Sequence, residues 1–336
     1  MRNVKNIVVI GGGTGTYTVL SGLKKYPPDF LDLTAIVTVA DSGGSTGRLR
    51  DEFGYLPVGD FRQALVALAD DSEGSAILRN LFLHRFSKGT GLSGHNFGNL
   101  FLVAMTDIAG SEEAAIALAA KVLRVRGKVL PVSKEKLTLV ARYEDGAVVR
   151  GEAHIDEPAE GHNGALRIGE LSVEPTTAET TREVKDTLAQ ADCIVVGPGD
   201  LYTSTLAALV VPGVREALQA SPARIVQIVN LMTKYGQTHG LSARAHVEEV
   251  ARYIGRSPDA VLVNKTPLPG DVLSRYEAQQ GFPVGDDLDG AQGAYTVMRG
   301  DFLAQEEIKK ASGDVLKRSL IRHDSDKLAH AIAALL

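Results

Sequence analysis

The stretch IVVIGGGTG, residues 7–15, decides the fold. Its first four residues are β-branched and apolar, and the run is too short for a helix. Glycines follow at once, as they do where a buried parallel strand leads into a loop. An apolar helical stripe at Val19, Leu20 and Leu23 comes next. The order strand, loop, helix is the first unit of a parallel α/β sheet.

Short apolar runs of the same kind recur along the chain. Further strands are predicted at residues 34–39, 193–196, 224–229 and 260–263. Helices are predicted at residues 214–219, 246–254 and 323–336. This alternation predicts an α/β fold with a doubly wound, mostly parallel, Rossmann-like sheet. The C-terminal helix is apolar enough to pack on its own sheet or on a second copy, so a homo-oligomer is one possibility.

Two stretches depart from that alternation. A helix-rich block is predicted over about residues 59–125, where apolar residues recur at helical spacing after Asp60, the predicted N-cap. A small antiparallel insertion is predicted over about residues 134–175, because the period changes to two. Its strands are residues 136–142, 147–154 and 166–173, with a turn at residues 144–146. We expect one domain spanning residues 1–336.

The composition excludes several classes of function. With 41 acidic and 36 basic residues the net charge is -5, so no basic surface for nucleic acid or for an anionic membrane is expected. No segment approaches the ~20 apolar residues of a spanning helix, so membrane insertion is not expected. The single cysteine, Cys193, lies in a predicted buried strand, which favours a reducing cytoplasmic setting.

The chain has 35 glycines, and clusters of them follow the ends of predicted strands. Glycine lets backbone amides approach an anion, and a following helix N-terminus adds partial positive charge, so these ends suit a phosphate-bearing ligand. Ligands of open parallel sheets bind at the carboxyl ends of the strands. The candidate ligand-binding residues there are Gly12, Gly13, Thr14, Gly15, Asp41, Ser42, Gly43, Gly44, Ser45, Gly197, Pro198, Gly199, Asp200, Ser204, Asn230, Thr233 and Asn264.

Each of these loops has a plainer explanation as well. The first glycine loop lacks the spacing of a dinucleotide fingerprint and the lysine of a P-loop, and could be a tight turn. Asp41 could bond a ribose, coordinate Mg²⁺ or close an Asx-turn. Arg48 could bond a phosphate or lie on the surface. Ser204 and Asn264 could be cap and turn residues.

Two further motifs leave alternatives open. In GHNFGN, residues 94–99, the candidates His95, Asn96 and Asn99 could meet the ligand or only cap the following helix. The run GGSTG, residues 43–47, matches the nucleophile elbow of serine hydrolases, with Asp200 and His239 in the right chain order. An elbow serine precedes a long helix, whereas we expect residues 48–54 to break, so a hydrolase is disfavoured.

Four motifs together resemble the gluconeogenesis factor family, of YvcK type and CofD-like. They are IGGGTG (residues 10–15), TVADSGGSTGRLR (38–50), LSGHNFGNL (92–100) and GPGDLYTS (197–204). The resemblance implies a CofD-like fold, a cytoplasmic protein needed for cell shape on gluconeogenic carbon sources, and binding of a UDP-sugar such as UDP-N-acetylglucosamine. The related 2-phospho-L-lactate transferase implies Mg²⁺ and a nucleotide ligand, with the catalytic candidates Asp41 and Asp60 near the reacting phosphates.

The chain departs from the family pattern at two places. Residues 233–240 read TKYGQTHG where a PGETDG-like run is expected, so Lys234 and Tyr235 are expected to reshape the pocket. Asp41 and Ser42 replace a usual pair of aspartates. We therefore favour a nucleotide-sugar-binding regulator without turnover over a Mg²⁺-dependent phospho-group transferase, and both over a serine hydrolase.

Overall fold

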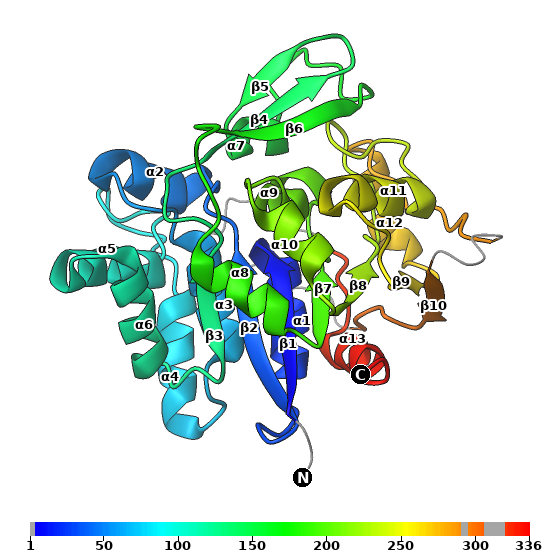
Figure 1. Ribbon diagram of the computed structural model, residues 1–336. Coiled ribbons are helices and arrows are strands. Elements are labelled where there is room, and N and C mark those ends of the chain that lie inside the picture. The colour runs from blue at the N-terminus through cyan, green and yellow to red at the C-terminus, as the bar shows by residue number, and fades with distance from the viewer. Residues whose placement is uncertain (1–3, 290–294, 306–319) are drawn as a thin grey trace.

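A seven-stranded parallel sheet forms the centre of the molecule (Figure 1). The computed structural model describes residues 4–289, 295–305 and 320–336. The strand order is β10-β9-β8-β7-β1-β2-β3, so the chain winds outward in two directions from the neighbouring strands β1 and β7. The strands are β1 (Lys5–Gly11), β2 (Leu31–Val37), β3 (Lys128–Pro131), β7 (Cys193–Val196), β8 (Arg224–Ile228), β9 (Ala260–Asn264) and β10 (Thr296–Gly300). The predicted doubly wound parallel sheet is confirmed.

The central strands are buried on both faces, which is why their sequences are continuous apolar runs. Residues Ile7 to Ile10 of β1 are at most 1% exposed and pair with β7 in register. Helices cover both faces, with α8 (Arg182–Gln190) and α10 (Val214–Ala220) in front of the central strands in Figure 1. The C-terminal helix α13 (Ser325–Ala333) packs on α1 (Gly13–Leu23).

The predicted helical block packs against the β2–β3 part of this sheet, and the antiparallel insertion forms a separate small sheet. The block contains α3 (Gly59–Leu68), α4 (Glu73–Leu83), α5 (Phe97–Ala109) and α6 (Glu112–Val122). The insertion is a three-stranded sheet in the order β5-β4-β6, made of β4 (Thr138–Tyr143), β5 (Val148–Arg150) and β6 (Ile168–Glu174). In Figure 1 this small sheet stands above the carboxyl ends of the parallel strands.

Inside the insertion the predicted strand over residues 147–154 is wrong beyond Arg150. Gly151 takes a φ of 93°, and the chain turns into a short helix, α7 (Glu152–Asp156). The hydroxyl of Ser42 accepts from the backbone N–H of Ala153 at 3.0 Å, so a distant residue supports the first turn of this helix. Alternating apolarity could not reveal that contact.

Residues 48–53 lie in α2 (Gly44–Phe53), a helix that was not predicted, and the expected early break comes at Gly54, which takes the left-handed conformation. An expectation at another element boundary was wrong. The N-cap of α3 is Val58 and not Asp60, which lies in the first turn. The segment after β7 starts as a π-helix, η1 (Leu201–Thr205), and continues as α9 (Leu206–Leu209). The remaining helices are α11 (Ala243–Ile254) and α12 (Gly270–Glu277).

None of the helices in the described part of the chain combines the length and the apolarity needed to cross a membrane.

Candidate functional site

A pocket opens where the two directions of winding meet, at the carboxyl ends of β1 and β7. It holds about 430 Å³. The two glycine loops touch there, since a Cβ added to Gly15 would lie 1.8 Å from the carbonyl oxygen of Pro198. Such a junction is where open α/β sheets bind their ligands. The contact explains why both loops are rich in glycine.

The first loop presents the N-terminus of α1 to the pocket. Gly12 is the N-cap of α1 and contributes no side-chain cap, while Gly13, Thr14 and Gly15 line the pocket. The carboxylate of Asp60 accepts from the N–H of Gly13 at 2.9 Å from behind the loop. Backbone amides and a helix N-terminus together favour an anionic group at this position.

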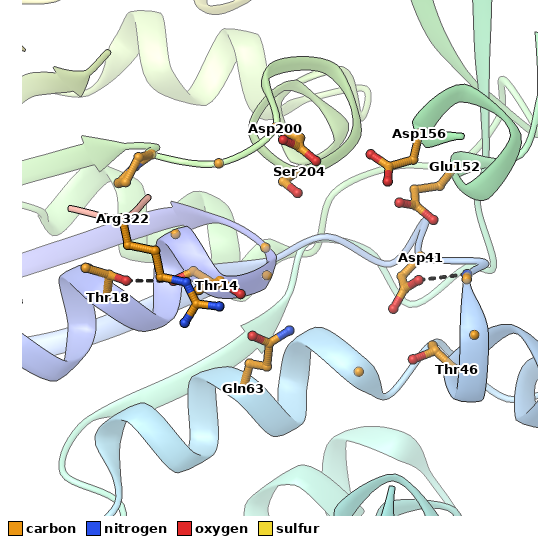
Figure 2. A pocket seen from close by; sticks show the side chains of 18 of the residues that line it. Thr14, Thr18, Asp41, Thr46, Gln63, Glu152, Asp156, Asp200, Ser204 and Arg322 are labelled. Carbon is orange, nitrogen blue, oxygen red and sulfur yellow. Dashed lines mark hydrogen bonds between the residues drawn. The ribbon is translucent and has the colours of Figure 1, made fainter. Parts of the chain in front are cut away.

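A second helix N-terminus faces the same pocket from α2. Its N-cap, Gly43, donates its N–H to Oδ1 of Asp41 at 2.9 Å, which is the Asx-turn that the sequence left open. Gly44, Ser45 and Thr46 follow and line the pocket. In Figure 2, Asp41 and Thr46 lie on the same side of the site. Two helix starts whose N-cap residues are glycines therefore meet in one cavity.

Ser45 has partners other than those of the hydrolase triad that the sequence disfavours. Its hydroxyl lies 3.2 Å from Nδ1 of His95 and accepts from Nδ2 of Asn99 at 3.3 Å. Asp200 is bonded to Lys234, and the ring of His239 packs on Tyr235 and Phe282. The Ser45–His95 contact is one that the sequence did not predict.

Three carboxyl groups, Asp41, Asp60 and Glu152, form what we call the Asp41 cluster. Burial raises the pKa of Asp60 to about 7, and the neighbouring Asp41 adds to that rise. Burial, with Asp41 and Asp156 nearby, raises the pKa of Glu152 to about 9. The pKa of Asp41 is raised by burial as well, although the N–H of Gly43 opposes this. Crowded, buried carboxyls of this kind favour a proton or a cation.

Asp156, Asp200 and Lys234 form a second group, the Lys234 cluster. Nζ of Lys234 donates to Asp156 and, at 2.9 Å, to Oδ2 of Asp200. Burial alone would raise the pKa of Asp156, but the Lys234 ammonium outweighs it and lowers that pKa. Burial raises the pKa of Asp200, and Lys234 opposes the rise. Figure 2 shows Asp156 and Asp200 on neighbouring sides of the site, with Glu152 next to Asp156.

Most of the predicted ligand-binding residues line this pocket. They are Gly12, Gly13, Thr14, Gly15, Asp41, Gly43, Gly44, Ser45, Asn99, Pro198, Gly199, Asp200, Ser204 and Asn230. The other predicted ligand-binding residues lie outside the lining of the pocket, namely Ser42, Arg48, His95, Asn96, Gly197, Thr233 and Asn264, and so does the catalytic candidate Asp60.

The residues outside the lining have structural partners. Asn96 caps α5 by accepting from the N–H groups of Gly98 and Asn99. Asn264 accepts from the N–H of Phe302 and donates to Thr266, as a turn residue does. These are the plainer alternatives that the sequence had left open.

The sequence reasoning missed several residues that line the pocket. Glu152 and Asp156 come from α7, and Tyr276, Arg322 and His323 come from the C-terminal third of the chain. Arg62 and Gln63 come from α3. In Figure 2, Gln63 and Arg322 lie on the opposite side of the site from Asp156. Only the separation of two acidic residues by one helical turn in α7 could have drawn attention to Glu152 and Asp156.

Within residues 4–289, 295–305 and 320–336, no three His, Cys, Asp or Glu side chains are placed to hold a metal ion together. Mg²⁺ commonly takes one or two carboxylates and completes its shell with phosphate oxygens and water. Asp41 and Glu152 are the lining carboxyls that fit this role.

The chain is similar to known proteins over nearly its whole length. The family described as 2-phospho-L-lactate transferase CofD matches residues 7–303. A gluconeogenesis factor of Halalkalibacterium halodurans is 41% identical over 98% of this chain and 95% of its own length. The gluconeogenesis factor of Bacillus subtilis is 40% identical over 100% and 99% of the two chains. The chain belongs to the CofD-like gluconeogenesis factor family.

A solved structure supports the same family and fold. The crystal structure of a UPF0052 family protein of Bacillus halodurans has a TM-score of 0.86 to this chain, with 38% sequence identity and 99% of both chains covered. The resemblance and the CofD-like fold expected from the four sequence motifs are thereby confirmed.

Proposed function

We propose that this member of the gluconeogenesis factor family is a cytoplasmic regulator that binds a nucleotide-sugar of the UDP-N-acetylglucosamine kind. The observation that carries the proposal is the convergence of two helix N-termini, each with a glycine as its N-cap residue, and two touching glycine loops in one pocket. Such groups hold a diphosphate without a basic surface. This fits a chain whose net charge is -5.

Calorimetric titration with UDP-N-acetylglucosamine tests the proposal, with N-acetylglucosamine as the ligand control. We expect saturable binding of the nucleotide-sugar only. Asn230→Asp adds a negative charge to the lining and should weaken binding about tenfold, ~1.4 kcal/mol. Its matched control is Asn163→Asp on the exposed surface, which should bind as the wild type does. Absence of heat at millimolar ligand with folded protein would overturn the proposal.

The regulatory part of the proposal is supported by the family alone. Relatives at about 40% identity carry the name gluconeogenesis factor, and a link to cell shape and carbon metabolism follows the resemblance. Expression of this chain in Bacillus subtilis lacking its own gluconeogenesis factor should restore growth and rod shape on a gluconeogenic carbon source. Failure of the well-expressed chain to do so would count against this role.

A second candidate is a Mg²⁺-dependent phospho-group transferase. It is favoured by Asp41 and Glu152, which face the pocket, and by the match to the transferase family. Bound Mg²⁺ would neutralise charge on the transferred group, while Asp60 would hold the glycine loop through the N–H of Gly13. This function predicts Mg²⁺-dependent release of a nucleotide from an activated donor. Full activity in both Asp41→Asn and Asp60→Asn, with Asp29→Asn as a surface control, would exclude those roles.

A further inference from the structure

The ammonium of Lys234 is held between two different parts of the molecule. Asp156 belongs to α7 in the insertion, and Asp200 follows β7 of the parallel sheet. Oδ1 of Asp156 also accepts from Oγ1 of Thr203 at 3.1 Å and from Nε2 of Gln237 at 3.0 Å. Several donors from separate segments therefore fix the position of the Asp156 carboxylate.

The geometry leaves the carboxylates, and not the ammonium, at the pocket surface. Asp156 and Asp200 line the pocket, whereas Lys234 lies outside its lining. An ionised carboxylate, such as that of Asp156 beside the Lys234 ammonium, only accepts hydrogen bonds, and charge-assisted bonds are stronger than neutral ones. The side of the pocket lined by Asp156 and Asp200, which we call the acidic wall, consequently suits donors such as hydroxyl groups and repels an anionic group.

The glycine loops and the acidic wall differ in the ligand groups that they favour. The N-termini of α1 and α2 favour phosphate, while Asp156 and Asp200 disfavour it. Resting on the proposed function, we propose that Asp156 and Asp200 form the subsite for an uncharged, hydroxyl-bearing group of the ligand, such as a sugar ring. Lys234 is a positioning residue that acts through the two carboxylates. The subsite accepts neutral sugars and rejects acidic ones.

Binding of three probes, UDP, UDP-N-acetylglucosamine and UDP-glucuronate, tests the subsite by calorimetry. The neutral sugar should tighten binding about tenfold relative to UDP, and the glucuronate should bind no more tightly than UDP. In Lys234→Met and in Asp200→Asn we expect the ratio of UDP-sugar affinity to UDP affinity to fall toward one. Lys234→Arg should recover most of the ratio, because it keeps the positive charge between the two carboxylates.

Lys25→Met is the matched control, since Lys25 also pairs with an aspartate, Asp326, but on the exposed surface. It should leave the ratio unchanged. A wild-type protein that binds UDP but gains nothing from the sugar, or that prefers the glucuronate, would overturn the subsite and leave the proposed function standing. A protein that binds none of the three would overturn both. Thermal melts of each variant identify loss of folding, and Asp200→Asn keeps the test decisive where Lys234→Met is unstable.

Discussion

The two carboxyl clusters of the pocket face the same cavity but are stabilised in different ways. In the Lys234 cluster a lysine from the chain itself lies between two aspartates. In the Asp41 cluster the carboxyls crowd one another, and burial raises the pKa of Asp60 to about 7 and of Glu152 to about 9. The first cluster holds an ammonium hydrogen-bonded to both carboxylates, whereas in the second the positive charges of Arg62 and Arg50 only partly oppose the rise in pKa caused by burial. The charge of the pocket therefore depends on pH and ligand mainly at the Asp41 cluster.

Both clusters depend on the contact between the two glycine loops, so Gly15→Ala should have the largest effect. The added Cβ would lie 1.8 Å from the carbonyl oxygen of Pro198, and neither backbone can yield cheaply. We expect a loss of about 3 kcal/mol in the free energy of unfolding, at the upper end of overpacking, together with loss of ligand binding. Chemical denaturation measures the loss. Gly91→Ala is the control, because a Cβ there meets nothing within 4 Å.

The second-largest effect is expected from removing the Lys234 ammonium, which should lower the stability of the protein, whereas removing a carboxyl of the Asp41 cluster should not. Lys234→Met leaves Asp156 and Asp200 without their shared partner, and breaking a fully buried ion pair costs about 3–5 kcal/mol. The three side chains here remain 27–39% exposed, so water screens the loss and we expect about 2 kcal/mol. Asp60→Asn should be neutral or stabilising, because it relieves crowding in the Asp41 cluster. Urea midpoints that fall equally in both variants would show that the clusters do not differ.

The pH dependence of stability isolates the Asp41 cluster. A carboxyl whose pKa is higher in the folded state keeps a proton that the unfolded chain releases, so stability falls as the pH rises from the unfolded to the folded pKa. For Glu152 this interval runs from 4.5 to about 9. After screening we expect the metal-free protein to lose about 1–2 kcal/mol across it. Glu152→Gln should flatten the profile, and an unchanged slope in urea unfolding would contradict the assignment.

The parallel sheet was predictable because its central strands are buried on both faces, so their sequences consist of consecutive apolar residues. The edge strands β3 and β10 escaped prediction, since β10 has no fully buried residue and β3 has only four residues. The helix α2 escaped because it begins with glycine, serine and threonine and buries only Leu49 among its large apolar residues. Its stability comes from tertiary contacts, which a local pattern does not contain.

The candidate site was predictable where glycine gathers at strand ends and unpredictable where α7 contributes. The glycine loops are visible in the local sequence as glycine runs after the strands, whereas the contact that requires a glycine at Gly15 is made with the distant Pro198. The role of Lys234 depends on Asp156 and Asp200, which lie 78 and 34 residues away in the chain. Contacts between residues so far apart leave no pattern in the local sequence. The sequence therefore showed that Lys234 departs from the family pattern, but it did not predict the contacts of Lys234 with Asp156 and Asp200.

The smallest expected effect concerns α7, which joins the two clusters by carrying Glu152 at one end and Asp156 at the other. At its first end the hydroxyl of Ser42 accepts from the N–H of Ala153. Ser42→Ala removes that one acceptor and should cost about 1 kcal/mol, the usual contribution of a single hydrogen bond. Because Lys234 still holds the other end, amide hydrogen exchange should increase at Ala153 and remain slower toward Asp156. Equal increases along α7 would mean that the helix is not anchored separately by the two clusters.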